Sequence, residues 1–282
     1  MSDPLPATSN PDEDNDPMAS MPFPMPSDEH LRDDPDPAEP ESVTRLRART
    51  AAIVESFRTV TAHQPAHETP VTDDLAERRV QNQRDAWRNS LAACDKSEYA
   101  DRSLSELSDD QHGDTLRTYA HNLAHASARN LVFAGRVGAG KTTAACAIAR
   151  AGLEQGMSAR FMEHSKYLLW LRPDQMPAVG PYRGVTANQL RARMRHADVL
   201  VLDDLGASLD PAVPVTQFVK DETLTLLGDR LNTPGRITII TTNRKPDELV
   251  AMFGEQFLSR LSQGGVALTF LGPDRRGRRL TW

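Results

Sequence analysis

Cysteine is scarce in this chain. Only Cys94 and Cys146 occur among 282 residues, and neither has a cysteine or histidine neighbour at metal-ligand spacing. The sequence therefore indicates neither a disulfide framework nor a zinc site. Of the eight histidines, His121 and His125 stand four residues apart, but such an isolated pair is more typical of solvated or capping side chains than of ligands.

Long apolar runs are also missing. No stretch approaches the roughly 20 residues needed to cross a bilayer. The N-terminus is acidic and interrupted by proline, whereas a secretory signal is basic and then apolar. We therefore expect a cytoplasmic protein without membrane contact. The 39% hydrophobic content is enough for a substantial core, and 282 residues allow one large or two small domains.

Basic side chains are nearly absent from the first 41 residues. Residues 1–41 hold twelve acidic residues against Arg32 alone, so residues 42–282 carry a net charge of +5 although the whole chain carries −6. Ten of the twenty prolines lie there too, some of them in the run MPFPMP at 21–26. Because this segment has too little apolar surface to offset the entropy of ordering, we expect a disordered acidic tail. A docking role for residues 21–26 is the alternative to a merely solubilising one.

Residues 42–128 are predicted to be helical and separate from residues 129–282. Apolar residues recur at helical spacing over 43–60, and a second helix is predicted to begin near Thr72. Its apolar positions are Leu75, Val80, Trp87 and Leu91, and its basic positions are Arg78, Arg79, Arg84 and Arg88. Residues 104–128 are interpreted as a linker and a further helix. A region this small has a limited core of its own, which favours a partner-binding surface over an independent bundle.

The run 135–142, GRVGAGKT, matches the phosphate-binding pattern G-x-x-x-x-G-K-[ST] at every position. Its glycines let backbone N–H groups turn toward phosphates, Lys141 reaches the terminal phosphates, and the Thr142 hydroxyl can bind Mg²⁺. An apolar run lies before it and an alanine-rich helical pattern after it, as the motif requires. The sequence therefore predicts an ATP and Mg²⁺ site. The predicted nucleotide-binding residues are Gly135, Arg136, Val137, Gly138, Ala139, Gly140, Lys141, Thr142 and Thr143.

From residue 130 onward, strand-like runs alternate with helical patterns, which is typical of a parallel sheet covered by helices. The runs lie at 131–134, 159–162, 199–202, 237–242 and 266–271. The third run ends in Asp203 and Asp204, at the edge where open α/β sheets bind ligands. We expect Asp203 to hold Mg²⁺ and Asp204 to orient or deprotonate the attacking water.

Two further residues are candidates for the same chemistry. Asn243 comes directly after the fourth run and is placed to hydrogen-bond the attacking water or the terminal phosphate. Arg260 stands on an otherwise apolar helical segment at 257–261. It either pairs with a carboxylate or acts as an arginine finger on the nucleotide of a neighbouring subunit.

Four motifs taken together resemble a known family. They are VLVLDDLG at 199–206, the Thr-Thr-Asn ending at 241–243, Ser-Arg-Leu at 259–261 and GPDRR at 272–276. In this order they resemble the DnaC-type helicase loaders, a group of AAA+ ATPases related to DnaA and to the IstB transposition ATPases. The resemblance covers roughly residues 130–276, and four ordered motifs are far more specific than the phosphate loop alone.

The resemblance implies a domain plan and a function. After the acidic tail that composition predicts at 1–41, it implies a helical partner-binding region at 42–128 and an AAA+ ATPase domain at 129–282, with no C-terminal helical lid. It implies an ATPase that binds a hexameric replicative DNA helicase and single-stranded DNA, and that assembles into a homo-oligomer. Asn243 becomes the sensor residue and Arg260 the finger acting in trans. Lys166, Arg172 and Arg183 lie where related proteins contact DNA, although such residues are more often solvated surface.

Asp204 is a departure from the family pattern, because many AAA+ proteins have glutamate there. The shorter carboxylate predicts slow hydrolysis, stimulated by DNA or a partner. Other functions remain open at this point: an IstB-like ATPase helper of DNA transposition, a small-molecule kinase, or an ATP-binding adaptor with negligible turnover. Asn243 and Arg260 argue against the kinase, because a kinase needs a substrate pocket and no finger in trans.

Overall fold

The computed structural model describes residues 73–210 and 212–275 of the chain. The predictions for the tail at 1–41 and for the apolar spacing at 43–60 lie outside these residues. Among the described residues, no helix has the length and apolar character needed to span a membrane.

Five parallel strands form one sheet in the order β2-β3-β4-β1-β5. They are β1 (Asn130–Gly135), β2 (Ala159–Glu163), β3 (Val199–Asp203), β4 (Ile237–Thr242) and β5 (Gly265–Phe270). Every residue of β3 and β4 is buried, as expected for apolar strands covered on both faces. The predicted five-stranded parallel sheet is confirmed.

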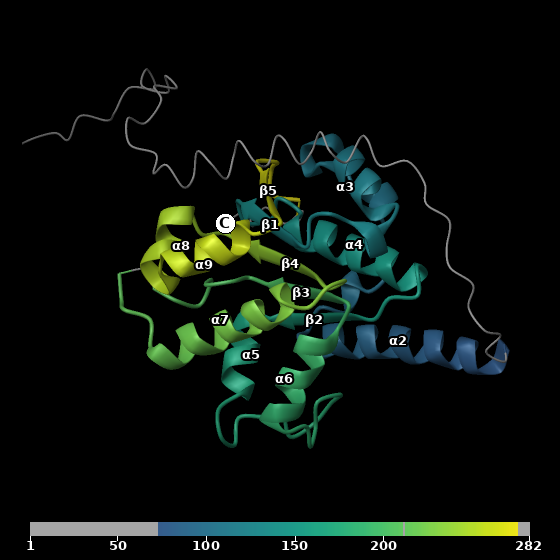
Figure 1. The fold of residues 1–282 in the computed structure, drawn as a ribbon, viewed down its shortest axis with the longest axis horizontal. Coiled ribbons are helices and arrows are strands. Elements are labelled where there is room, and N and C mark those ends of the chain that lie inside the picture. Colours follow the sequence, from purple (N-terminus) through teal and green to yellow (C-terminus); the bar gives the residue numbers. More distant parts are fainter. Residues whose placement is uncertain (1–72, 211, 276–282) are drawn as a thin grey trace, which may run out of the picture. The chain divides into compact units, whose positions relative to one another are not determined.

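Helices cover both faces of this sheet (Figure 1). The first group is α2 (Asp73–Ala93), α3 (Gly113–Ala120) and α4 (Lys141–Glu154), joined by the short 3-10 turns Ser97–Tyr99, Leu104–Glu106 and Asp109–Gln111. A fourth 3-10 turn, Leu123–His125, precedes β1. The remaining helices are α5 (His164–Trp170), α6 (Ala187–His196), α7 (Gln217–Leu231), α8 (Pro246–Phe253) and α9 (Glu255–Ser262). Figure 1 shows α4 on one side of the sheet and α7 and α9 on the other.

The strand register brings the functional segments to one edge. Phe133 on β1 pairs with Thr241 on β4, and Leu202 on β3 pairs with Ile240. Because the strands are parallel, β1, β3 and β4 therefore end side by side, and the residues directly after them share the carboxyl edge of the sheet.

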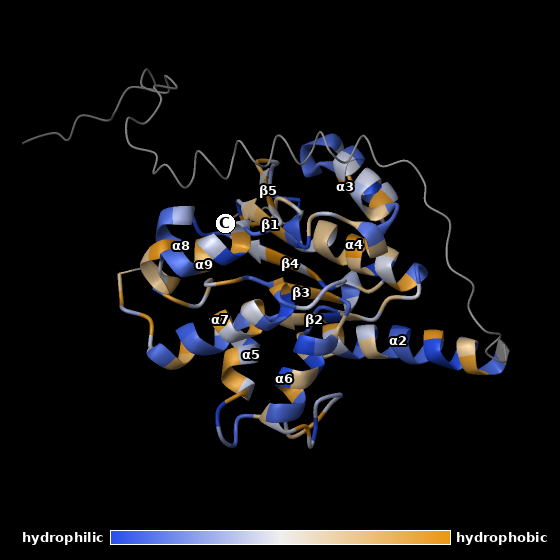
Figure 2. Cartoon of the chain, viewed as in Figure 1, coloured by the Kyte–Doolittle hydropathy of each residue, from blue (hydrophilic) through white to orange (hydrophobic). Residues whose placement is uncertain are grey.

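Small side chains let α4 approach the sheet closely. Residues 144–149 are all buried, and four of the six are alanine. Cys146 lies among them, and burial raises the pKa of its thiol well above the ordinary value. Cys94 is likewise buried and free, so neither thiol is part of a disulfide. Figure 2 shows that apolar residues gather on the strands, whereas polar residues lie on the outer faces of the helices.

The C-terminal half of α2 covers the outer edge of the sheet. Trp87 and Leu91 are buried, and the Trp87 ring meets Phe161 of β2 edge to face at a centroid distance of 6.5 Å. The backbone N–H of Phe161 donates to the Ser90 hydroxyl at 2.9 Å, which satisfies an edge-strand donor. Residues from 87 to 128 thus belong to the same hydrophobic core as the sheet. The division at residue 128 stays a prediction.

The N-terminal half of α2 differs from the expected apolar stripe. Leu75 is 57% exposed, so the stripe reaches the sheet only with its later members. The reason is length, because this half of α2 extends past the sheet into solvent (Figure 1).

Candidate nucleotide site

The phosphate loop is built between β1 and α4. Gly138 and Gly140 have φ of 77° and 94°, in the left-handed region that favours glycine. A Cβ at Gly138 would lie 1.8 Å from Asp274 Oδ1, and one at Gly140 would lie 1.9 Å from Gln111 Nε2. The loop therefore needs both glycines for its backbone conformation and for the close approach of two other segments. The helix that starts at Lys141 directs its free N–H groups toward this loop.

Lys141 is buried, with 6% of its surface exposed. Its Nζ donates to the Gly135 carbonyl at 3.0 Å, to the Arg136 carbonyl at 2.7 Å and to Asn243 Oδ1 at 2.6 Å. These bonds satisfy the ammonium group and hold it over the loop. They also join the ends of β1 and β4, so Lys141 and Asn243 meet although 102 positions separate them.

Asp203 lies fully buried behind the loop. Its Oδ1 accepts hydrogen bonds from Thr142 Oγ1 at 2.9 Å and from Thr241 Oγ1 at 2.6 Å. Its Oδ2 has no hydrogen-bond partner among the residues that the structure describes. Burial, followed by the nearby charge of Asp204, raises the pKa of Asp203 to about 6. A buried carboxylate with one oxygen that accepts no hydrogen bond is suited to bind a cation.

The donors at Asp203 fit Mg²⁺. Within the described ranges, no group of three or more His, Cys, Asp or Glu side chains stands at metal-binding distance. Mg²⁺ does not require such a group, because it keeps water and substrate phosphates as ligands and takes one or two oxygens from the protein. Thr142 Oγ1 and Asp203 supply hard oxygen ligands of this kind.

Asp204 and Asn243 face the open side of the site. Asp204 has φ of 53°, an uncommon left-handed conformation, and its backbone N–H donates to Thr241 Oγ1 at 2.9 Å. Both side chains line a pocket of about 370 Å³ beside the phosphate loop. The pocket is lined by Tyr99, Arg102, Val137, Gly138, Gly140, Lys141, Thr142, Thr143, Asp204, Asn243 and Arg275.

Three of these pocket residues were not predicted from the sequence. Tyr99 and Arg102 come from the segment between α2 and α3, where no motif marks them. The Arg102 guanidinium lies 5.9 Å from the centroid of the Tyr99 ring. Arg275 belongs to the GPDRR run at 272–276, so a signal was present, but its place in the pocket was not predicted. Its backbone N–H donates to the Gly138 carbonyl at 3.0 Å, and its side chain pairs with Asp110.

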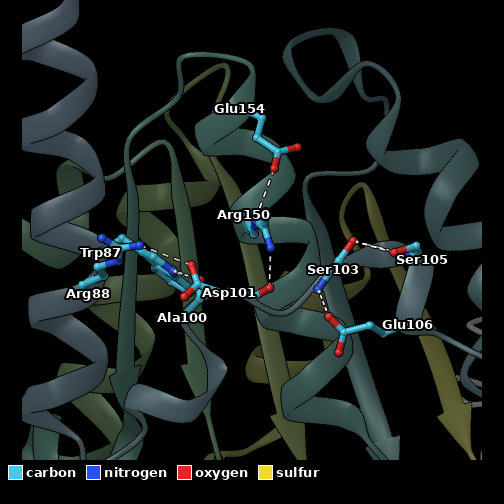
Figure 3. A network of polar contacts seen from close by, with 9 residues as sticks. All are labelled: Trp87, Arg88, Ala100, Asp101, Ser103, Ser105, Glu106, Arg150 and Glu154. Atoms are coloured by element: carbon cyan, nitrogen blue, oxygen red, sulfur yellow. Dashed lines mark hydrogen bonds and ion pairs between the residues drawn. The ribbon is translucent and has the colours of Figure 1, made fainter.

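A polar network fixes the segment that carries Tyr99 and Arg102 (Figure 3). Trp87 Nε1 donates to the Ala100 carbonyl at 3.1 Å, and Arg150 of α4 donates to the Asp101 carbonyl. Ser103 then caps the turn Leu104–Glu106, with its own N–H donating to Glu106 Oε1 at 3.0 Å. The segment is thus tied to both α2 and α4, and this holds its side chains at the pocket.

Arg260 lies outside the pocket of its own chain. It stands on α9, and its Nη1 donates to the Leu224 carbonyl of α7 at 2.7 Å. No carboxylate partner for it exists in the part of the chain that the structure describes.

The basic residues after β2 differ from one another. Lys166 pairs with Asp95 at 2.7 Å, at the end of α2, whereas Arg172 and Arg183 are exposed. The Lys166 ammonium is therefore already engaged, whereas the two arginines lie at the surface.

The sheet order, the loop and the buried carboxylate define a P-loop nucleotide-binding protein with an AAA+ type of fold. Residues 50–261 match the family described as IstB-like ATP binding protein. This match spans about three quarters of the sequence, and the chain therefore belongs to that family. No curated protein matches the chain.

The chain is similar to several solved structures at low sequence identity. The DnaC helicase loader has a TM-score of 0.50 at 22% identity, over 61% of this chain and 98% of that one. DnaI has a TM-score of 0.50 at 21% identity, over 64% and 93%. A DNA replication initiation factor has a TM-score of 0.46 at 16% identity, over 60% of this chain, which spans only 49% of that protein. The resemblance to DnaC-like AAA+ proteins is confirmed at the level of the fold, and the family shown is the IstB-like one.

Proposed function

We propose that this chain is an ATP-dependent helicase loader that binds a hexameric replicative DNA helicase and helps to place it on single-stranded DNA. The observation that carries the proposal is the convergence of Lys141, Asp203 and Asn243 at the ends of β1, β3 and β4. The order of the four motifs, the family match and the DnaC-like fold support it. An ATPase of this kind would act as a homo-oligomer.

The residues divide the work at the nucleotide. Lys141 exchanges its carbonyl and amide partners for terminal phosphate oxygens when ATP binds. Thr142 and Asp203 hold Mg²⁺, which supplies charge neutralisation at the phosphates when bound. Asp204 orients the attacking water and accepts its proton, and Asn243 hydrogen-bonds the water or the phosphate. Because Asp204 is short and turnover needs accurate placement, hydrolysis is slow without DNA or a partner.

The pocket residues that the sequence did not reveal extend the site. Tyr99 and Arg102, on the segment between α2 and α3, contact the nucleotide. Arg275 contacts it from the segment that follows β5. Arg260 acts on the ATP of a neighbouring subunit, because it stands away from the pocket of its own chain. A dilute, monomeric Arg260→Ala protein that hydrolyses ATP at the wild-type rate would contradict this assignment.

A second candidate is an ATPase helper of DNA transposition. The family match at 50–261 favours it, since the matched family carries the IstB name. Both candidates share the ATPase core and differ in the partner, which is a helicase for one and a transposase for the other. A test of partner identity therefore separates them.

The experiment is co-purification of the full chain with the replicative helicase of its own cell, in ATP and single-stranded DNA. Removal of residues 42–128 would disrupt the shared core, so the partner surface is tested with Arg79→Glu and Arg84→Glu on the exposed face of α2. The matched control is Arg172→Glu with Arg183→Glu. We expect the first pair to weaken helicase binding and the second to weaken DNA binding. DNA-stimulated ATPase activity without any helicase binding would favour the transposition helper.

A further inference from the structure

Arg244 comes directly after Asn243, and its side chain reaches the turn that leaves Asp204. Its Nε donates to the Gly206 carbonyl at 3.2 Å, and its Nη2 donates to the carbonyls of Ala207, at 3.4 Å, and Leu209. Glu248, in the first turn of α8, pairs with Nη1 at 3.5 Å. A single guanidinium thus spans three carbonyl acceptors on the segment after β3.

Backbone and hydroxyl groups join the same two segments. The Leu205 N–H donates to the Thr241 carbonyl at 2.9 Å, and Thr242 Oγ1 donates to the Leu205 carbonyl at 2.9 Å. The Arg244 N–H donates to Thr242 Oγ1 at 3.0 Å. These bonds continue the contact between β3 and β4 past the sheet, and the Arg244 side chain forms the outermost part of it.

The turn after Asp204 needs such support. Asp204 adopts φ of 53°, a conformation that carries strain of about 1 kcal/mol or more for a residue with a side chain. Leu205 is buried and Leu209 packs against the hydrophobic core, whereas Ala207, Ser208 and Asp210 are exposed. Arg244 adds hydrogen bonds to three carbonyls of this turn, and the planar fork of arginine suits several acceptors at once.

We propose that Arg244 is a positioning residue for ATP hydrolysis, which rests on the function proposed above. It does not line the nucleotide pocket. It clamps the turn that begins at Asp204 onto the segment that carries Asn243. The carboxylate of Asp204 and the amide of Asn243 are thereby kept at a fixed separation on the two sides of the attacking water.

The test uses the full chain with Arg244→Lys, which keeps the charge and the aliphatic stem but offers one donor group in place of a fork. Arg244→Ala removes all three bonds. Glu248→Gln is the matched control, because it removes the charge that pairs with Arg244 and leaves the carbonyl contacts intact. Each protein is measured for DNA-stimulated kcat, for the Kd of an ATP analogue and for thermal midpoint.

For Arg244→Lys we expect kcat to fall by tenfold to about a hundredfold while the nucleotide Kd changes by less than about twofold. Glu248→Gln should keep kcat within about twofold of the wild type. Wild-type kcat in folded Arg244→Lys would overturn the proposal, and so would a loss confined to nucleotide affinity. A wild-type chain that binds ATP without turning it over would instead overturn the proposed function, and this inference with it.

Discussion

The two edges of the sheet each bury a charged side chain, and they treat it in opposite ways. At the amino edge, Arg230 of α7 is 1% exposed and donates to the Thr238 hydroxyl and to the carbonyls of Met194, Ala197 and Ile237 at 2.7–2.9 Å. At the carboxyl edge, Asp203 is equally buried, yet its Oδ2 lacks a partner among the described residues. The protein thus supplies hydrogen-bond acceptors for the whole Arg230 guanidinium, whereas it leaves one oxygen of the Asp203 carboxylate without a donor among the described residues.

The difference separates a structural charge from a functional one. Arg230 ties the end of α6 to the first residues of β4, and burial lowers the pKa of Arg230 to about 9 without leaving any of its three nitrogens unbonded. Asp203 is raised in pKa by the same physical cause, but its free oxygen faces a site for a ligand that the chain itself does not supply. An unsatisfied buried group destabilises the fold, and ligand binding offsets that destabilisation.

The largest effect on stability is expected for Arg230→Met. The change leaves three buried carbonyls and a hydroxyl without their donor, so the free energy of unfolding should fall by about 3–5 kcal/mol. Urea unfolding followed by circular dichroism measures it. Lys220→Met, on the same helix but partly exposed, is the control and should stay within about 0.5 kcal/mol of the wild type. Equal losses in both variants would contradict a special role for Arg230.

A pH-dependent effect is expected from His164, which lies near the carboxyl edge. Burial lowers the pKa of His164 to about 4, and its ring bonds to Thr223 Oγ1 at 3.0 Å. The unfolded chain takes up this proton below about pH 6.5, whereas the folded chain does so only near pH 4. The stability that His164 contributes is therefore complete above pH 6.5 and falls by about 3 kcal/mol as the pH drops to 4.

Unfolding of the wild type and of His164→Gln between pH 7 and pH 4 measures this contribution. The advantage of the wild type should shrink as the pH falls. Asp203 contributes in the opposite direction, because its folded pKa is raised, but it is common to both proteins and cancels in the difference. A difference that stays constant with pH would show that His164 does not carry the effect.

The smallest effect is expected for Asp203→Asn without nucleotide. Removing a buried, incompletely bonded charge should leave stability unchanged or raise it by about 1 kcal/mol at pH 7.5. The same variant should lose the extra stability that Mg²⁺ with ATP gives the wild type. Thermal unfolding with and without Mg²⁺ and ATP tests both parts. A destabilisation as large as that of Arg230→Met would erase the contrast between the two edges.

Much of the carboxyl edge could be predicted from the sequence. Apolar and β-branched runs that alternate with helical patterns are typical of strands buried on both faces, so the positions of β3 and β4 could be predicted from the sequence pattern. The residues that end such strands then had to meet, which placed Asp203 and Asn243 together. In the structure Asn243 accepts a hydrogen bond from Lys141, and the meeting of Asp203 with Asn243 stays a prediction.

The partners of Arg230 at the amino edge and the pocket residues Tyr99 and Arg102 could not be predicted from the sequence. The partners of Arg230 are mainly backbone carbonyls, and every residue has one, so no pattern marks the site. Tyr99 and Arg102 reach the pocket because Trp87 and Arg150 hold their segment in place, which is a consequence of tertiary packing. The exposure of Leu75 also depends on tertiary packing. Helical spacing predicts which residues share a face of α2, but it does not predict how far α2 extends beyond the sheet.

The most direct test of the account is calorimetric titration of the full chain with ATP and Mg²⁺, beside Lys141→Ala. We predict binding at one site per chain for the wild type and loss of binding for Lys141→Ala, with the folded state of the variant confirmed by its thermal midpoint. No binding by the wild type, or undiminished binding by folded Lys141→Ala, would contradict the claim that this pocket is an ATP site.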